Sequence, residues 1–179
     1  MRETSLEKLR EKAAKIKWFF CDIDGTLTDG GVYYSPEGEM LKRFSLRDGT
    51  GFFLLSQCKI KSGFITTEKS AIVEQRAKKL KIEKYIYGTH HKVEAINDFL
   101  ATEGLNMDNV AFIGDELNDV KLMKACGLSF AVGDADHRAK DAADIVCEHE
   151  GGYGAFREAV EKLLDLKQID IDEIINKTL

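Results

Sequence analysis

The chain has 179 residues, of which 44% are hydrophobic and 32% charged, as expected of a globular domain large enough to bury its own core. Its formal net charge of −5 argues against nucleic acid as a partner, and no apolar run is long enough to span a membrane. Because the charged start, residues 1–17, lacks the apolar centre of a secretory signal, we expect a single domain over 1–179 in the cytoplasm.

The four cysteines show no sign of a disulfide framework or a zinc site. Cys21, Cys58, Cys126 and Cys147 are widely spaced and form no C-x-x-C pair. Because each lies in or beside an apolar stretch, we expect buried free thiols.

The first part of the chain predicts a helix, a buried strand and an acidic loop. Within the leading segment 1–16, Ser5 precedes helix-forming residues and would cap a short helix. The apolar run 16–21 predicts a strand, after which the chain reads Asp22-Ile23-Asp24-Gly25. In an extended chain the side chains of Asp22 and Asp24 point the same way, so both carboxylates can face one small site.

Two adjacent carboxylates either share a proton or hold a hard cation, and both arrangements suit phosphate chemistry. One carboxylate could attack phosphorus while the other protonates the departing alkoxide. The simpler interpretation is a strand that ends in a polar turn, because Asp and Gly are ordinary turn residues. The motif alone leaves both interpretations open.

Residues 31–45 predict a β-hairpin flap, because two short apolar runs surround a turn that contains the chain's only proline, Pro36. A hairpin of this size is not stable without something to pack on. We therefore expect Val32, Tyr34 and Leu41 to pack against hairpins of other subunits in a closed oligomer.

Strand-like and helical patterns alternate through the rest of the chain. We expect Asp48 to cap a helix that runs to about Gln57. Further strands are predicted at 60–65, 85–87, 110–114, 128–132 and 144–146, and further helices at 69–80, 91–103, about 118–126 and 155–166, with a short helix between the last two strands. The tail, 167–179, either forms a helix or docks elsewhere. The alternation predicts an α/β fold with a parallel sheet covered by helices on both faces.

Polar residues follow three of the predicted strands, which is where ligands bind in sheets of this kind. Asp22 and Asp24 follow one strand, Thr66 another and Asp115 a third. The acids are oxygen ligands of the type that Mg²⁺ prefers, although acids also favour any helix N-terminus.

Two further side chains could bind a phosphate group at the same edge. Thr66 offers a hydroxyl and a backbone N–H to a phosphate oxygen, and Lys92 offers a positive charge. The alternatives are an ordinary threonine at a strand end and a solvated lysine on a helix.

The order of these residues resembles the haloacid dehalogenase superfamily of phosphohydrolases, over about residues 18–166. The resemblance implies a Rossmann-like fold without a cap domain, because the gap between the first two motifs holds only the hairpin and one helix. The implied catalytic residues are Asp22 as nucleophile, Asp24 as general acid and base, Thr66 and Lys92. The implied cofactor is Mg²⁺, held by Asp22, the Asp24 backbone carbonyl and Asp115, with Asp119 supporting them.

Motifs at 47–51 and 151–158 are similar to those of the capless phosphatases that act on 3-deoxy-2-ulosonate phosphates. The similarity implies a homotetramer in which hairpins meet centrally and neighbours help to close each active site. Arg47 and Arg76 are candidate partners of the sugar carboxylate. The residues expected to bind substrate are Ser45, Arg47, Asp48, Gly49, Thr67, Glu68, Arg76 and Lys79.

The chain departs from the octulosonate 8-phosphate enzymes of this group at two places. Thr66-Thr67-Glu68 stands where they usually have Thr-Gly-Arg, and Phe53 stands where they tend to carry Arg. Glu68 with Lys79 looks more like the enzymes for nonulosonate (KDN or sialic-acid-type) 9-phosphates. Since losing two cations changes how an anionic sugar is recognised, we expect a nonulosonate 9-phosphate to be preferred and KDO 8-phosphate to come next.

Two other functions stay open. A broader sugar-phosphate phosphatase would carry the same catalytic residues, whereas a non-catalytic oligomerisation module of this fold would need none of them. The presence of Asp22, Asp24, Lys92 and Asp115 argues against the module.

Overall fold

The computed structural model describes residues 5–178, so residues 1–4 of the predicted leading segment and Leu179 of the tail lie outside it. The chain forms a six-stranded parallel sheet in the order β5-β4-β1-β6-β7-β8 and a separate hairpin of β2 and β3. The sheet strands are β1 (Trp18–Cys21), β4 (Lys61–Ile65), β5 (Lys84–Ile86), β6 (Val110–Gly114), β7 (Leu128–Ala131) and β8 (Ile145–Val146). The predicted α/β fold is confirmed.

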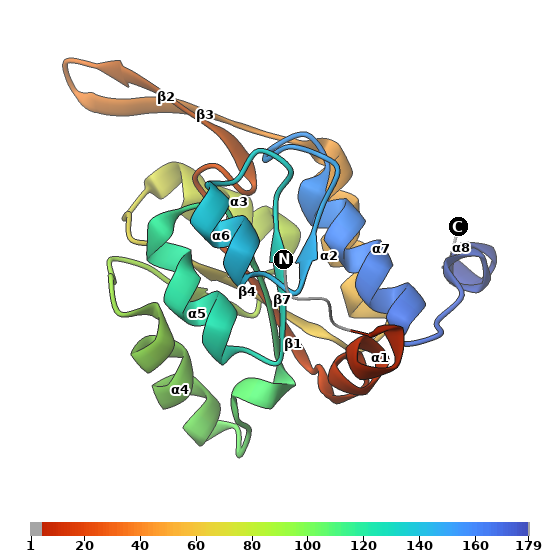
Figure 1. The fold of residues 1–179 in the computed structure, drawn as a ribbon. Helices are drawn as coiled ribbons and strands as arrows, with labels where there is room; N and C mark the ends of the chain where they lie inside the picture. The colour runs from red at the N-terminus through yellow and green to blue at the C-terminus, as the bar shows by residue number, and fades with distance from the viewer. Residues whose placement is uncertain (1–4, 179) are drawn as a thin grey trace.

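Helices cover both faces of this sheet. Figure 1 shows α2 and α7 on one side of it and α4 and α5 on the other, and the helices of each side pack on one another. The helices are α1 (Leu6–Lys15), α2 (Leu46–Gln57), α3 (Ala71–Leu80), α4 (Lys92–Thr102), α5 (Val120–Ala125), α6 (His137–Ala142), α7 (Ala155–Leu166) and α8 (Ile171–Thr178), with short 3₁₀ helices η1 (Met107–Asn109) and η2 (Leu117–Asp119). No helix within residues 5–178 is both long enough and apolar enough to cross a membrane.

Buried aromatic rings fix α2 and α7 on the sheet. Phe156 of α7 stacks on Phe52 of α2 with ring centroids 4.1 Å apart, and it also lies 5.3 Å from Phe19 of β1. Phe19 in turn stacks on Phe130 of β7. Aromatic contacts of this kind bury large apolar areas, so they hold the central strand and its two covering helices in a fixed relation.

The sheet order brings the predicted site residues to one edge. β1 lies between β4 and β6, with Cys21 paired to Phe64 on one side and to Ile113 on the other. The residues that follow these strands, Asp22, Thr66 and Asp115, therefore emerge side by side. The chain leaves β1 for β4 in one direction and later reaches β6 in the other, which makes this edge a topological switch point.

The prediction that Asp48 caps a helix is wrong. α2 begins at Leu46, and its cap is Ser45, whose hydroxyl accepts the backbone N–H groups of Arg47 and Asp48. The tail does form a helix, α8, and the four cysteines are free thiols, with Cys58 only half-buried.

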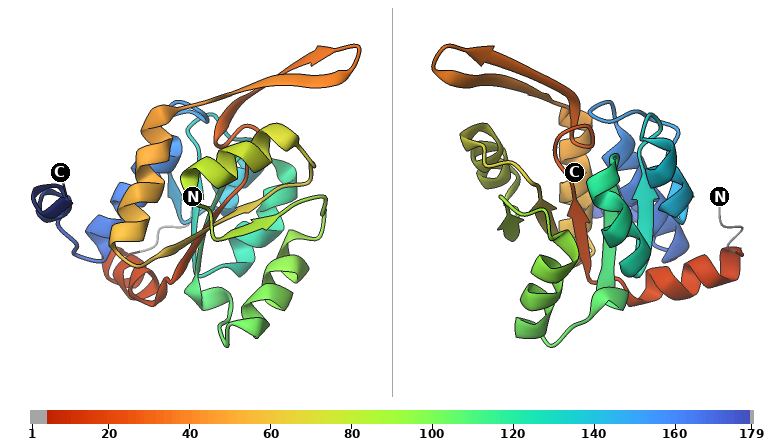
Figure 2. Two further views of the ribbon diagram at one scale, coloured as in Figure 1. Left: turned by 180° about the vertical axis from the view of Figure 1, so that it is seen from behind. Right: turned by 60° about the vertical axis from the view of Figure 1, so that its left-hand side comes forward.

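The hairpin, β2 (Thr28–Ser35) and β3 (Gly38–Phe44), extends away from the body of the molecule (Figures 1 and 2). Within the described residues its strands pair only with each other. Val32 is half-buried, whereas Tyr34 is 72% exposed and Leu41 55% exposed. Two of the three predicted contact residues, Tyr34 and Leu41, are thus exposed.

Candidate active site

A buried ion-pair cluster forms where β1 ends. The Nζ atom of Lys92 donates to Oδ1 of Asp22 at 2.8 Å and to Oδ1 of Asp119 at 2.6 Å. All three residues are at least 96% buried. Lys92 reaches this position because it begins α4, which starts at the same edge of the sheet. Lys92 is therefore not the solvated lysine of the alternative interpretation.

Asp115 and Asp119 complete the cluster from the loop after β6. The second oxygen of Asp119 accepts the backbone N–H groups of Asp115 and Glu116 at 3.0 and 3.3 Å, which holds that loop in place. The hydroxyl of Thr26 donates to Oδ1 of Asp115 at 2.7 Å. As a result, one carboxylate oxygen from each of Asp22, Asp115 and Asp119 lies within 4.8 Å of the others.

The acids repel one another in a setting with little water. Burial and the neighbouring Asp119 charge raise the pKa of Asp22, and Lys92 opposes this only in part. Burial raises the pKa of Asp115 to about 7, against the hydrogen bond from Thr26. Burial by itself would lower the pKa of Lys92, but Asp22 and Asp119 outweigh it and the pKa is raised. Lys92 thus stays a cation, and within residues 5–178 no second cationic side chain hydrogen-bonds these three acids.

This donor set fits a divalent cation. Carboxylate oxygens are the ligands of Mg²⁺, and a cation beside Asp22 and Asp115 would offset the burial and, after it, the mutual repulsion that raise their pKa values. The loop is shaped for close approach, because a Cβ atom on Gly25 would lie only 2.1 Å from Oδ2 of Asp115. Gly25 has a φ of +88°, a conformation that glycine adopts without strain.

Asp24 lies in a different setting from the three clustered acids. Its Oδ1 accepts a hydrogen bond from Nζ of Lys42 at 2.5 Å. Lys42 belongs to β3 of the hairpin, and its side chain is only 2% exposed because it also contacts Glu39 at 3.0 Å. The sequence analysis did not identify Lys42, since no local pattern marks one lysine of a hairpin as buried.

Thr66 is buried at the end of β4, and only one of its two predicted donors to a phosphate oxygen, the hydroxyl, is available. Its backbone N–H donates to the carbonyl of Ile86 as part of the sheet, so that group is not free for a phosphate oxygen. Its hydroxyl oxygen accepts the N–H of Glu68 at 3.1 Å, which leaves the hydroxyl proton available. Thr67 beside it is half-buried and Glu68 is exposed.

The loop after β8, at Gly151 and Gly152, packs directly against the loop that follows β1. A Cβ atom on Gly151 would lie 1.8 Å from the carbonyl oxygen of Gly25, so only glycine fits there. The N–H of Gly152 donates to the carbonyl of Thr26 at 3.0 Å, and Asp134 accepts the N–H of Gly151 at 2.9 Å. The glycines of the 151–158 motif thus pack against the loop that carries Asp22 and Asp24, and Asp134 is a support that the sequence analysis missed.

Three predicted substrate-binding residues take part in the scaffold. Ser45 caps α2. The Asp48 carboxylate is buried and accepts the N–H groups of Gly154 and Arg157, which ties the start of α2 to the start of α7. Gly49 faces Arg76, whose Nη2 would lie 3.1 Å from a Cβ at that position.

The predicted cationic residues do not join the cluster within one chain. Arg76 donates to the carbonyl of Ser45 at 2.9 Å and lies over the ring of Phe44. Arg76 and Lys79 line, with Phe53, a pocket of about 380 Å³ between α2 and α3 that contains none of the clustered acids. Arg47 lines another pocket, beside His149 and Arg157.

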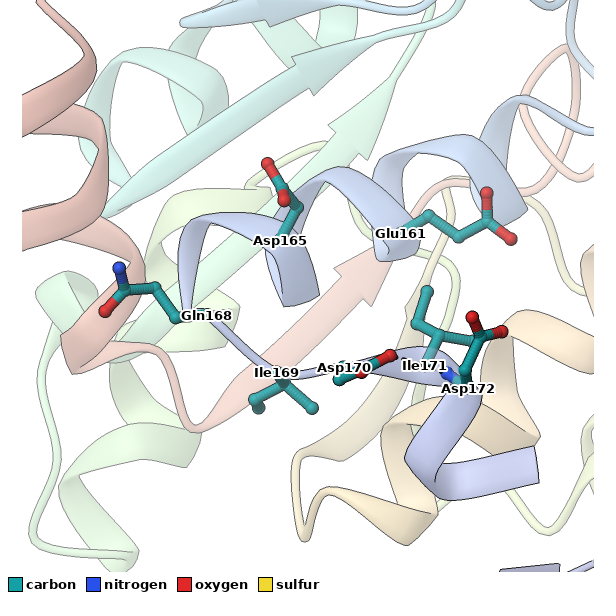
Figure 3. A pocket seen from close by; sticks show the side chains of 7 residues that line it. All are labelled: Glu161, Asp165, Gln168, Ile169, Asp170, Ile171 and Asp172. Carbon is teal, nitrogen blue, oxygen red and sulfur yellow. Dashed lines mark hydrogen bonds between the residues drawn. The ribbon is translucent and has the colours of Figure 1, made fainter. Parts of the chain in front are cut away.

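A further pocket, of about 410 Å³, lies between the end of α7 and the start of α8 (Figure 3). Every ionisable side chain that lines it is an acid, so it would repel a phosphate. The lining residues are Glu161, Asp165, Gln168, Ile169, Asp170, Ile171 and Asp172.

Comparisons with known proteins agree with this geometry. The family model for haloacid dehalogenase-like hydrolases matches residues 61–155. The 3-deoxy-D-manno-octulosonate 8-phosphate phosphatase of Haemophilus influenzae is 36% identical over 156 residues, which is 87% of each chain, and that of Escherichia coli (strain K12) is 39% identical over 162 residues, 90% of this chain and 86% of the relative.

A solved structure of the same kind of enzyme is closely similar. The Moraxella catarrhalis 3-deoxy-D-manno-octulosonate 8-phosphate phosphatase, solved with a magnesium ion, a phosphate ion and KDO, superposes with a TM-score of 0.91 at 32% identity. The match covers 98% of this chain and 100% of that one, so the likeness extends over the hairpin as well as the sheet.

Proposed function

This chain belongs to the capless haloacid dehalogenase-like hydrolases and is a phosphoric monoester hydrolase that uses Mg²⁺, and from that premise we propose that it hydrolyses a 3-deoxy-2-ulosonate phosphate through an aspartyl phosphate on Asp22. The observation that carries the proposal is the buried contact of Lys92 with Asp22 and Asp119, beside Asp115. We further propose that the whole chain, including the flap 31–45 and the tail 167–179, acts as one catalytic domain.

The first half of the reaction forms the covalent intermediate. The Asp22 carboxylate attacks phosphorus, the ester P–O bond to the sugar breaks, and Asp24 donates its proton to the leaving alkoxide. Lys92 keeps the Asp22 carboxylate oriented, and the Thr66 hydroxyl can donate to a phosphate oxygen. The products of this half are aspartyl phosphate and the free sugar acid.

The second half restores the enzyme. Asp24, now a carboxylate, takes a proton from water as the water attacks phosphorus, and the P–O bond to Asp22 breaks to release inorganic phosphate. Asp22, the backbone carbonyl of Asp24 and Asp115 would hold the Mg²⁺ ion, with Asp119 fixing their loop. When bound, that ion offsets the negative charge of the phosphate oxygens.

The identity of the sugar acid rests on two opposing observations. The relatives are named for octulosonate 8-phosphate, which makes that the second candidate. In this chain, however, an exposed carboxylate, Glu68, directly follows Thr66 and Thr67, and its backbone N–H donates to the Thr66 hydroxyl oxygen. A carboxylate accepts hydrogen bonds from hydroxyl or amine groups but repels the carboxylate that both substrates carry. The nonulosonate 9-phosphate is longer by one carbon between its phosphate and its carboxylate, so we propose that it is preferred because it keeps its carboxylate farther from Glu68.

Steady-state kinetics with both ulosonate phosphates and simple hexose phosphates test the substrate. We expect the wild type to have a higher kcat/KM for a nonulosonate 9-phosphate, and Glu68→Arg to reduce or invert that preference. Glu83→Gln, a change away from Thr66, serves as the control and should leave the preference unaltered. A wild-type kcat/KM at least about tenfold higher for octulosonate 8-phosphate, a difference of about 1.4 kcal/mol, would contradict the role of Glu68.

We propose that the enzyme is a closed homotetramer in which hairpins meet, since Tyr33, Tyr34 and Leu41 are exposed on a hairpin with little cover. Arg76 and Lys79 line the pocket between α2 and α3, away from the clustered acids of their own chain. In the tetramer these two side chains would serve the active site of a neighbouring subunit. Light scattering should give four times the chain mass, and Tyr34→Lys with Leu41→Lys should lower it. A wild-type monomer at micromolar concentration would end the proposal.

A further inference from the structure

One lysine of the hairpin is placed unlike its neighbours. Most of the hairpin is exposed, yet the Lys42 side chain is 2% exposed. It lies between two carboxylates, 2.5 Å from Oδ1 of Asp24 and 3.0 Å from Oε1 of Glu39. Such a buried ammonium loses side-chain freedom and hydration, so its contacts to Asp24 and Glu39 must compensate.

A β-bulge makes this arrangement possible. Residues 39 and 42 are three apart, so in a regular strand their side chains would point to opposite faces. Here Tyr33 pairs with Leu41 while Tyr34 pairs with Glu39, so Met40 is an extra residue in β3. The extra residue brings Glu39 and Lys42 to the same face, where bulges characteristically re-aim a side chain.

The pair is also anchored to the body of the protein. The Ser70 hydroxyl donates to Oε2 of Glu39 and, as the cap of α3, accepts the N–H of Val73. Figure 2 shows the hairpin extending above α3. Lys42 is thus held between the acid that follows β1 and a helix of the core, rather than by the hairpin alone.

We propose that Lys42 is a positioning residue for the proposed reaction: it holds Oδ1 of Asp24, so that the free oxygen, Oδ2, is turned toward the substrate. The inference rests on the proposed function. Within residues 5–178 Lys42 is the side chain that hydrogen-bonds the Asp24 carboxylate, and it does so through Oδ1 alone. Lys42 touches neither phosphorus nor the leaving oxygen in this role; it restricts the rotation of the group that does.

A comparison of leaving groups separates this role from a structural one. An alkoxide leaving group needs a proton from Asp24, whereas p-nitrophenolate is stable enough to leave without one. Since kcat/KM reports the steps up to the first P–O cleavage, it is sensitive to the donation of that proton. For Lys42→Met we expect kcat/KM for the ulosonate phosphate to fall by about tenfold to a hundredfold, and that for p-nitrophenyl phosphate by less than about threefold. Lys42→Arg should recover part of the loss.

Lys61→Met is the matched control. Lys61 also pairs with a carboxylate, that of Glu103 at 2.6 Å, but it lies at the start of β4, whereas the active site lies where β4 ends. This variant should leave both substrates unchanged. Glu39→Gln offers a second route that keeps Lys42 in place and should give a smaller loss with the same selectivity.

An equal fall for both substrates, or no fall for either, would overturn the Lys42 role while leaving the phosphatase assignment intact. A wild type inactive on both phosphate esters would instead overturn the proposed function and the Lys42 role with it.

Discussion

Asp22→Asn is expected to abolish phosphatase activity while leaving the fold unchanged. The two side chains are nearly the same size, but an amide cannot form the acyl phosphate on which the reaction depends. Asp22 is 96% buried and held by Lys92, so no neighbouring acid can take its place without moving the cluster. The measurement is kcat with the preferred ulosonate phosphate, together with the melting temperature.

Asp98→Asn provides the matched control, since Asp98 is exposed on α4, the helix that carries Lys92. This variant should match the wild type. If Asp22→Asn kept activity within tenfold of the wild type, a barrier difference of about 1.4 kcal/mol, Asp22 could not be the nucleophile.

Removal of the metal ion is expected to have a comparably large effect. Activity should vanish in EDTA and return when Mg²⁺ is added in excess, because the Asp22, Asp115 and Asp119 carboxylates need a cation beside the incoming phosphate. Full activity in the chelator would contradict a metal-dependent mechanism. Zinc bound by the cysteines is a poor alternative, since all four are free thiols and, within the described residues, the one group with metal-ligand spacing consists of Asp22, Asp115 and Asp119.

The melting temperature supplies a second readout of the metal that does not depend on activity. The pKa of Asp115 is about 7 in the folded chain, above its unfolded value of 3.8. The metal-free fold therefore gains its full stabilisation from the protonated carboxyl at a pH below 3.8. This stabilisation is lost as the pH rises through about 7. Mg²⁺ binds the ionised acid, so it should raise the melting temperature more at pH 8 than at pH 5.

Asp115→Asn separates this effect from general salt stabilisation. Without the buried charge, the metal-free variant should melt higher than the wild type at pH 8 and should lose most of its response to Mg²⁺. An unchanged response would show that the ion binds elsewhere.

Much of the fold follows from local patterns. The strand β1 follows from an apolar run, and α7 has the predicted bounds, 155–166, because its apolar face repeats at helical spacing over three turns. The hairpin follows from two apolar runs around one proline. These features depend on residues within a few positions of one another, which is the range over which a single sequence carries its clearest signal.

In the candidate site, too, the local features could be predicted and the long-range contacts could not. That acids follow β1 and β6 is visible in the sequence, and their meeting at one edge could be predicted because the strands of a parallel sheet end on the same side. The contacts that give each acid its role were decided by the tertiary structure, since they join residues far apart in the chain: Lys92 to Asp22 across 70 positions, Asp48 to Gly154 across 106, and Lys42 to Asp24 across the hairpin. No local propensity encodes such pairings, because a buried charge selects its partner by where packing places it.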